Sequence, residues 1–228
     1  MSNLINIFVE PGKAFADLKE KPTFLLPLAL MMALTVVMSL LYFNKVDTEW
    51  FTSHQLAMSG SEMSAAEIEQ ARKMMPSASV IGIISAVMGP IMIVIVTLVM
   101  ALYYFVAGKV TGAGVSYKHS VSLVAWSGVP SMLSLVVAIV GIIMMAPQTA
   151  LESLMLTNVD PLIVQLPSDH AWSSFAKNFN LLSLWSVVVA AIGWRTWSRG
   201  GWGQAFTVAL IPTLFIFGCM AAWAVLKS

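Results

Sequence analysis

Five long stretches of this chain contain no Asp, Glu, Lys or Arg, and this pattern constrains the fold more than any other feature of the sequence. They cover residues 22–44, 74–108, 119–151, 178–194 and 200–226 of the 228-residue chain. One helical span of a bilayer needs about 20 consecutive apolar residues. The whole chain carries only 12 Lys and Arg and 11 Asp and Glu, which is too few to cover a soluble domain of this size. The pattern predicts an all-α polytopic transmembrane helical bundle.

We predict one membrane domain, residues 24–226, built of five spans. The spans are expected at about 24–43, 80–107, 121–146, 179–197 and 205–226. The first is too long for the apolar part of a signal peptide and lacks a small-residue cleavage site at its end, so we expect it to be retained. The fourth is the shortest, and without it the topology would have four spans.

The charges in the connections predict the orientation of the chain. With five spans, one side of the membrane carries seven basic and three acidic residues, and the other carries five basic and eight acidic residues. Basic residues are enriched in cytoplasmic loops. We therefore expect a multi-pass protein of the cell (inner) membrane with its N-terminus in the cytoplasm and its C-terminus outside. The loops 44–79 and 147–177 would then lie outside.

Residues 1–23 are predicted to form a cytoplasmic amphipathic segment. From Pro11 onward, apolar residues recur with the period of one helix face, and charged residues occupy the opposite face. Such a segment is expected to contact the membrane surface or a partner, through Phe8, Pro11, Phe15 and Leu18. The alternative is a short helix packed on the cytoplasmic ends of the bundle.

The two long outer loops differ in how clearly they can be interpreted. Ser64 and Glu67 form a capping-box pattern, which predicts a helix that continues to about Met75 and ends at Pro76. The second loop, 147–177, is interrupted by three prolines and contains a short apolar run. It is expected to fold over the outer mouth of the bundle.

Small and helix-breaking residues are the most informative feature inside the spans. They permit close approach of helix backbones or bends, and the positions selected are Gly82, Gly89, Pro90, Gly128, Pro130, Pro212 and Gly218. Packing within one bundle explains them. The functional alternative is a self-association face, or a mobile helix that lines a path for lipid or solute. Five spans do not divide into two equal halves, and no internal repeat is evident.

Aromatic, glycine and proline positions follow a characteristic order along the chain. Before the first span these are Phe8, Pro11, Phe15, Leu18, Pro22 and Pro27; in the centre they are Tyr103, Tyr104, Phe105, Gly108, Gly112, Tyr117, His119, Ala125 and Pro130; near the fourth span they are Asn180 to Trp185 and Gly193. This order resembles the Yip (Ypt/Rab-interacting protein) family of multispanning membrane proteins, in particular its bacterial branch. The family more often has an acidic residue at the position of Asn180.

The resemblance implies a membrane bundle with a role related to trafficking or to the cell envelope. Eukaryotic members are linked to Rab GTPases and vesicle traffic, whereas the bacterial branch offers no activity to transfer. The residues themselves indicate no catalytic chemistry, because the predicted spans contain no Asp, Glu, Lys or His and no Arg except Arg195, near the end of the fourth span. Such residues mark proton relays and buried catalytic sites in membranes.

We expect no catalytic site, no cofactor and no metal site. The three histidines are scattered, and a pair of His54 with an external carboxylate such as Asp169 is the alternative that remains for a metal ion. Apolar packing explains the 16 methionines without copper, and the single cysteine, Cys219, allows no intramolecular disulfide. A net charge of +1 provides no basic field for nucleic acid.

The sequence thus favours a noncatalytic integral membrane protein that organises membrane or protein partners. The expected partners are the lipid bilayer and a second copy of the chain or other membrane proteins. The alternative is a channel or carrier for an uncharged or lipid-like molecule. A polar interior pocket formed by Ser, Thr, Asn and Tyr would favour that alternative.

Overall fold

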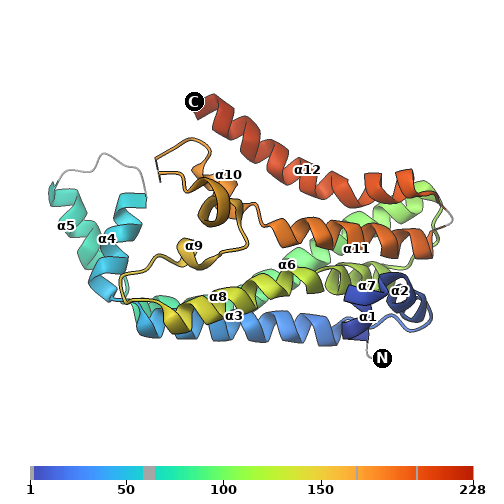
Figure 1. Cartoon of the computed structure of the whole chain (residues 1–228), viewed down its shortest axis with the longest axis horizontal. Coiled ribbons are helices and arrows are strands. Elements are labelled where there is room, and N and C mark those ends of the chain that lie inside the picture. Colours follow the sequence, from blue (N-terminus) through green and yellow to red (C-terminus); the bar gives the residue numbers. More distant parts are fainter. Residues whose placement is uncertain (1–2, 59–64, 168, 199, 228) are drawn as a thin grey trace.

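The computed structural model describes residues 3–58, 65–167, 169–198 and 200–227, and within them it is a helical bundle elongated along one axis (Figure 1). The helices that build the bundle are α3 (Leu25–Lys45), α6 (Ala78–Thr111), α7 (Tyr117–Ser127), α8 (Met132–Met144), α11 (Leu181–Trp197) and α12 (Trp202–Lys227). The only pairing of extended backbone among the described residues is an isolated bridge between Asn158 and Asn180.

Four helical stretches are long and apolar enough to cross a membrane: α3, α6, the continuous stretch Tyr117–Met144, and α12. Helix α11 has 17 residues, which corresponds to a length of roughly 26 Å. The helices cover the five predicted segments, with ends that differ by at most four residues. The prediction of a helical membrane bundle is confirmed. The number of spans and their orientation stay predictions.

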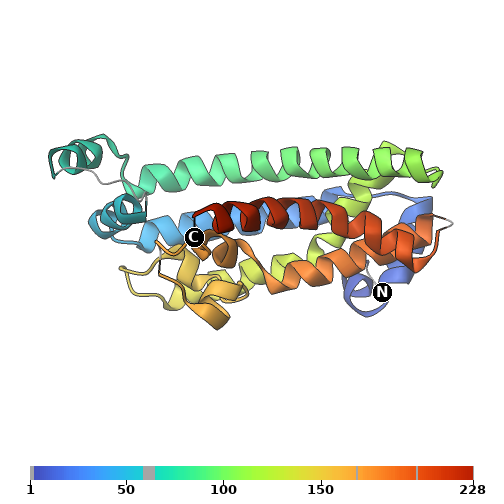
Figure 2. The ribbon, with the colours of Figure 1, turned by 90° about the horizontal axis from the view of Figure 1, so that it is seen from above.

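Helices α3 and α6 run in opposite directions and pack side by side (Figures 1 and 2). Two glycines of α6 lie in this contact. A Cβ on Gly82 would lie 2.6 Å from the Cβ of Phe43, and a Cβ on Gly89 would lie 2.9 Å from Cγ2 of Thr35. Because real Cβ atoms do not approach so closely, these glycines allow the two backbones to come together. Pro90 follows Gly89 inside the same helix.

The third predicted span consists of two helices joined by a short 3-10 turn, η1 (Val129–Ser131). Pro130 lies in this turn. Because proline has no backbone N–H, it would interrupt the hydrogen bonding of a continuous α-helix at this position. A Cβ on Gly128 would lie 3.3 Å from Cε of Met31 in α3. The change from α7 to α8 therefore occurs where the chain passes close to α3.

Helix α12 packs mainly against α11 and leaves much of its surface exposed. Pro212 lies inside the helix. A Cβ on Gly218 would meet no atom within 4 Å. The space beside Gly218 is therefore open to lipid or to another helix and is not filled by packing within this chain.

The remaining elements gather at the two ends of the bundle (Figures 1 and 2). Helices α1 (Asn3–Val9) and α2 (Pro11–Glu20) lie at the end where α6 connects to α7 and α11 to α12. The elements toward the other end are α4 (Thr48–Met58), α5 (Ala65–Met74), α9 (Leu151–Leu154), the π-helical turn η2 (Asp160–Val164) and α10 (Ser173–Asn178). Connections predicted to share one side of the membrane thus lie at the same end.

Helix α5 lies where the capping-box pattern predicts a helix, and it ends before Pro76. The proposed cap, Ser64, lies outside the described residues. Helix α4 and the three short helical elements of residues 147–177 were not anticipated from the sequence. Their contacts with one another create the site described next.

Candidate functional site

A cavity of about 540 Å³ lies between α4, the end of α3 and the segment that contains α9 and α10. We call it the polar cavity and define it by its polar side chains, which are His54, Gln55, Glu152, Asn158, Lys177, Asn178 and Asn180. Aromatic and aliphatic side chains complete its wall, among them Tyr42, Phe43 and Phe51. Polar and apolar groups thus share one hollow near the end of the bundle.

The start of α4 fixes the position of His54. The Asp47 carboxylate accepts a hydrogen bond of 2.7 Å from the backbone N–H of Trp50, as expected of a residue that caps a helix N-terminus. The Trp50 indole stacks on the His54 imidazole, with ring centroids 5.0 Å apart and planes inclined by 7°. Both features hold the imidazole in the wall of the cavity.

The opposite wall is formed by a segment that folds back on the bundle. The Tyr42 hydroxyl donates to the carbonyl oxygen of Thr149 over 3.1 Å, and the N–H of Asp47 donates to the carbonyl oxygen of Pro147 over 2.9 Å. Farther along, the N–H of Val159 donates to the carbonyl oxygen of Phe179 over 2.9 Å. These bonds bring Glu152 and Lys177 to the cavity from opposite ends of the segment.

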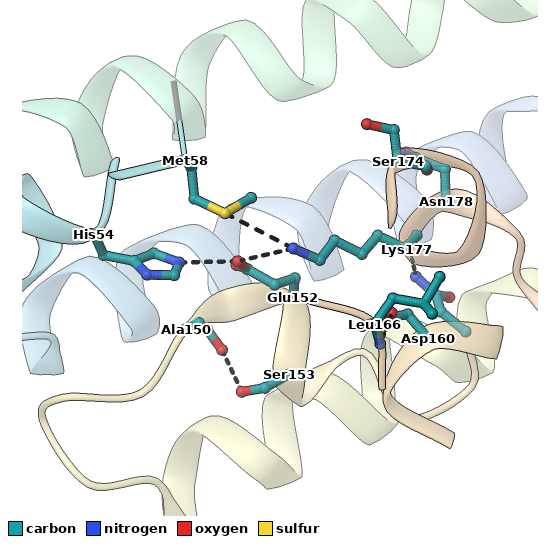
Figure 3. A network of polar contacts seen from close by, with 11 residues as sticks. His54, Met58, Ala150, Glu152, Ser153, Asp160, Leu166, Ser174, Lys177 and Asn178 are labelled. Carbon is teal, nitrogen blue, oxygen red and sulfur yellow. Dashed lines mark hydrogen bonds and ion pairs between the residues drawn. The ribbon is translucent and has the colours of Figure 1, made fainter. Parts of the chain in front are cut away.

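Glu152 is the centre of a charged cluster (Figure 3). Its Oε1 lies 2.9 Å from Nε2 of His54 and 3.9 Å from Nζ of Lys177. The Lys177 ammonium also lies 3.8 Å from Sδ of Met58, a weak acceptor. The Lys177 side chain is only 13% exposed, and its ammonium lies between the Glu152 carboxylate and the Met58 sulfur. The cluster is net neutral when the imidazole is neutral.

Asn158, which lines the same cavity, has an acceptor without a partner in the described part of the chain. Its Nδ2 donates to the carbonyl oxygen of Lys177 over 2.6 Å. Its Oδ1 is buried and has no hydrogen-bond partner among the described residues, and the residue as a whole is 9% exposed. An unpaired buried polar atom is costly and calls for an explanation.

Asn180 has a clear local role. Its Oδ1 accepts a hydrogen bond of 2.8 Å from the N–H of Leu182, and this caps the N-terminus of α11. Its Nδ2 donates to Oγ1 of Thr157 over 2.9 Å. An acidic side chain at this position would accept the same bond from Leu182, which explains how either residue type suits the helix start.

From the sequence, His54 could pair with an external carboxylate such as Asp169; the structure places Glu152 of the same loop beside His54 instead. Asp169 is exposed. Asp160 is buried, and its carboxylate accepts a hydrogen bond of 2.9 Å from the N–H of Leu166. No motif in the sequence singles out Glu152, because its contact with His54 joins residues 98 positions apart. Across the described ranges, no three His, Cys, Asp or Glu side chains are placed to hold a metal ion.

The N-terminal residues selected from the sequence lie at the opposite end of the bundle. Phe15 and Leu18 are fully buried, with exposed fractions of 0% and 1%. The Phe15 ring meets Trp197 edge to face, and the Trp197 indole N–H donates to the carbonyl oxygen of Phe15 over 2.6 Å. The apolar face of α2 therefore packs on the bundle, as in the second interpretation of this segment. Phe8 remains exposed and Pro11 half-buried.

Further hydrogen bonds hold the last turn of α2 and the chain that follows it. Nε2 of His119 donates to the carbonyl oxygen of Lys19 over 3.0 Å. The Ser122 hydroxyl and the Trp126 indole N–H both donate to the carbonyl oxygen of Thr23, over 2.8 and 2.7 Å. We call α1 and α2 together the N-terminal plate. Its position is fixed by apolar burial and by these hydrogen bonds.

Two of the positions that resemble the family, Phe15 of the plate and Gly193 of α11, lie in contact. A Cβ on Gly193 of α11 would lie 2.8 Å from Cζ of Phe15 and 2.6 Å from Cδ1 of Leu123. A larger residue at Gly193 would therefore collide with the ring that anchors α2. This contact gives a physical reason for a glycine in α11 to accompany an aromatic residue near the N-terminus.

Comparison with known proteins agrees with these features. The family model described as the Yip1 domain matches residues 5–224. The chain is 24% identical over 226 residues to Membrane protein YknW of Bacillus subtilis (strain 168), and the match covers 93% of this chain and 89% of that protein. No solved structure matches the chain. Because the family model spans nearly the whole sequence, the chain is a member of the Yip1 family of membrane proteins.

Proposed function

We propose that this protein is a noncatalytic organiser of protein partners or membrane, and that partners bind to the N-terminal plate. The observation that carries this proposal is the way α2 is held. Its apolar face is buried in the bundle, while charged residues at its start face outward: the side chains of Glu10, which precedes the helix, and Lys13 are 58% and 67% exposed. A rigid helix with an open charged face is well suited to recognise another protein.

The distribution of charge supports a role without proton coupling or membrane-embedded catalysis. In the long helices, Lys, Arg and His occur only within three residues of a helix end, and Asp and Glu are absent; the residues are Lys45, Lys109, Lys118, His119, Arg195 and Lys227. The polar cavity has a His–Glu pair, but no Ser, Thr or Cys of the described residues lines it as a nucleophile. The His54–Glu152 pair therefore has no hydroxyl or thiol nucleophile of this kind to activate among the described residues of the cavity.

The partner role predicts a specific effect of exchanging charges on the plate. Glu10 and Lys13 form an exposed ion pair of 3.5 Å. The double variant Glu10→Lys with Lys13→Glu keeps the net charge, and with it the topology signal, but reverses the local pattern. Partners are crosslinked in native membranes and quantified by mass spectrometry. We expect the amount of partner recovered with the double variant to be at least fivefold lower than the amount recovered with the unmodified protein.

The matched control lies at the other end of the molecule. Glu69 and Lys73 of α5 form a pair of 3.6 Å with similar exposure, 59% and 74%. Exchanging these two charges should leave the recovered partners unchanged. Equal recovery from both double variants, at equal protein levels in the membrane, would contradict a partner role of the plate.

The proposal includes five spans in the cell (inner) membrane, with the N-terminal plate in the cytoplasm. It is supported by the grouping of the basic connections at one end of the bundle. In a Cys219→Ser background, Lys73→Cys and Ser174→Cys should react with an impermeant maleimide added to intact cells, whereas Ser116→Cys should react only after lysis. All three positions are exposed. Labelling of Ser116→Cys in intact cells would reverse the orientation.

The second candidate is a carrier or channel for an uncharged or lipid-like molecule. The polar cavity favours it, because Tyr42, Asn158, Asn178 and Asn180 are residues of the kind expected in such a pocket. The cavity lies toward one end of the bundle, so a complete path would require movement of the spans. Self-association through the exposed face of α12 at Gly218 is proposed for either function.

A further inference from the structure

A groove of about 620 Å³ lies between the start of α1, the chain that joins α2 to α3, and α7, at the same end of the bundle as the N-terminal plate (Figure 1). We call it the plate groove, and its polar side chains are Asn3, Thr23 and Lys118. Their amide, hydroxyl and ammonium groups can all donate hydrogen bonds. No Asp or Glu of the described residues lines the groove. Its polar groups therefore suit an anion.

These donors are free to bind a ligand. Within the described ranges, none of the three side chains forms an ion pair or a hydrogen bond. The Thr23 backbone, in contrast, is held firmly, because its carbonyl oxygen accepts hydrogen bonds from the Ser122 hydroxyl and from the indole N–H of Trp126, over 2.8 and 2.7 Å. The Trp126 side chain is 1% exposed and forms part of the wall. A wall fixed in this way lowers the entropy cost of binding.

The rest of the wall is apolar and lies where a membrane helix begins. Phe24, Leu25 and Leu26 line the groove, and the side chains of Leu25 and Leu26 are 73% and 50% exposed. Helix α3, which starts at Leu25, is long and apolar enough to cross a membrane. The donors of the groove thus lie at the level of lipid headgroups, and its leucines lie toward the hydrocarbon. This order suits a molecule with a polar head and an apolar chain.

Charge determines which lipid fits the groove best. The Lys118 ammonium attracts a phosphate, but no carboxylate of the described residues lines the groove to pair with the ammonium of a zwitterionic headgroup. The connections at this end of the bundle carry seven basic and three acidic residues, and basic segments beside membrane helices attract anionic lipids. Both the local groups and their surroundings therefore favour a lipid with a net negative charge.

We propose that the plate groove binds one anionic phospholipid from the adjacent leaflet. The phosphate contacts the Lys118 ammonium and the donors of Asn3 and Thr23, and an acyl chain lies along Leu25 and Leu26. This inference deepens the membrane part of the proposed function. Glu10 and Lys13 do not line the groove. The charge exchange that tests the partner role can therefore fail while lipid binding persists, and lipid binding can fail while partners are still recovered.

The test uses the full-length protein in detergent, with native mass spectrometry to measure the apparent dissociation constant of the first lipid bound. Dioleoylphosphatidylglycerol should bind roughly fivefold or more tightly than dioleoylphosphatidylcholine, because only the second has an ammonium that the groove leaves unpaired. Glycerol 3-phosphate has a phosphate but no acyl chain. It should bind at least roughly tenfold more weakly than dioleoylphosphatidylglycerol.

Variants assign the binding to the groove. Lys118→Met should weaken binding of dioleoylphosphatidylglycerol about fivefold and leave that of dioleoylphosphatidylcholine nearly unchanged. Its control is Lys109→Met, which removes an exposed lysine at the same end of the bundle that does not line the groove. Leu26→Trp narrows the groove and should weaken binding of both lipids. Leu30→Trp changes another exposed leucine of α3, outside the groove, and should bind as the unmodified protein does.

Each other result overturns a stated part of the proposal. Equal affinities of the unmodified protein for the two phospholipids would reject the anionic preference. Tight binding of glycerol 3-phosphate would replace the lipid by a soluble phosphate ester. Equal effects of Leu26→Trp and Leu30→Trp would remove the acyl chain from the groove. An unchanged preference in Lys118→Met, or an equal loss in Lys109→Met, would reject the plate groove as the site.

Discussion

The variant Phe15→Ala is expected to lower the free energy of unfolding by about 3–5 kcal/mol, the range typical of a deleted buried aromatic ring. The Phe15 side chain has no exposed surface, and its ring packs edge to face on Trp197 and against the backbone space left by Gly193. Removing it leaves a cavity between α2 and α11. The measurement is equilibrium unfolding of the purified protein in mixed micelles.

Phe8→Ala is the matched control for this prediction. The Phe8 side chain is 37% exposed, so its loss should change the unfolding free energy by well under half as much. If Phe15→Ala instead unfolded like the unmodified protein and lost only binding to anionic vesicles, the buried position of α2 would be refuted. The membrane-surface interpretation of residues 1–23 would then replace it.

The variant Gly82→Leu is expected to destabilise the contact of α3 with α6 by about 1–3 kcal/mol or more, because it inserts a side chain into a filled space. Already the Cβ would lie 2.6 Å from the Cβ of Phe43, an atom that cannot move without its helix. The two helices must therefore separate along the contact. We expect a lower midpoint of unfolding in detergent and faster proteolysis of the connection between them.

Gly218→Leu provides the control, since a Cβ there meets nothing within 4 Å. Monomer stability should change little in this variant. If its effect equalled that of Gly82→Leu, then the face of α12 at Gly218 would be packed against another molecule in the sample. Sedimentation in the same detergent would reveal the oligomer. No difference between Gly82→Leu and the unmodified protein would contradict the close approach of α3 and α6.

The positions of the membrane helices follow from the sequence because the bilayer leaves few choices. A long apolar stretch must satisfy its backbone hydrogen bonds internally, and charged residues mark where it leaves the hydrocarbon. The bounds of α3, α6 and α12 therefore lie close to the expected ones. The sequence likewise indicates Gly82 as a place of close helix contact and Pro130 as a place where a helix bends. Few other roles suit these residues inside a span.

The sequence did not determine which surface the amphipathic segment of residues 1–23 contacts. Periodicity shows that Phe15 and Leu18 share one face of a helix, but a bilayer surface and the end of a bundle are both apolar enough to cover it. The bundle provides specific partners for this face. The Trp197 ring packs edge to face on the Phe15 ring, and its indole N–H donates a hydrogen bond to the Phe15 carbonyl oxygen. Gly193 leaves the space that the Phe15 ring needs.

The polar cavity depends entirely on the tertiary structure. His54 belongs to the connection 44–79, and Glu152 and Lys177 belong to the connection 147–177, so the second and third predicted spans separate them in the sequence. From the sequence alone, Asp169 was as suitable a partner for His54 as Glu152. Only the path of the chain around Tyr42 and the bridge between Asn158 and Asn180 bring the correct carboxylate to the imidazole. Apolar periodicity thus determined the helices of this protein, because the solvent imposes it locally. The pairing of its polar groups was decided by contacts between distant residues, which no local pattern records.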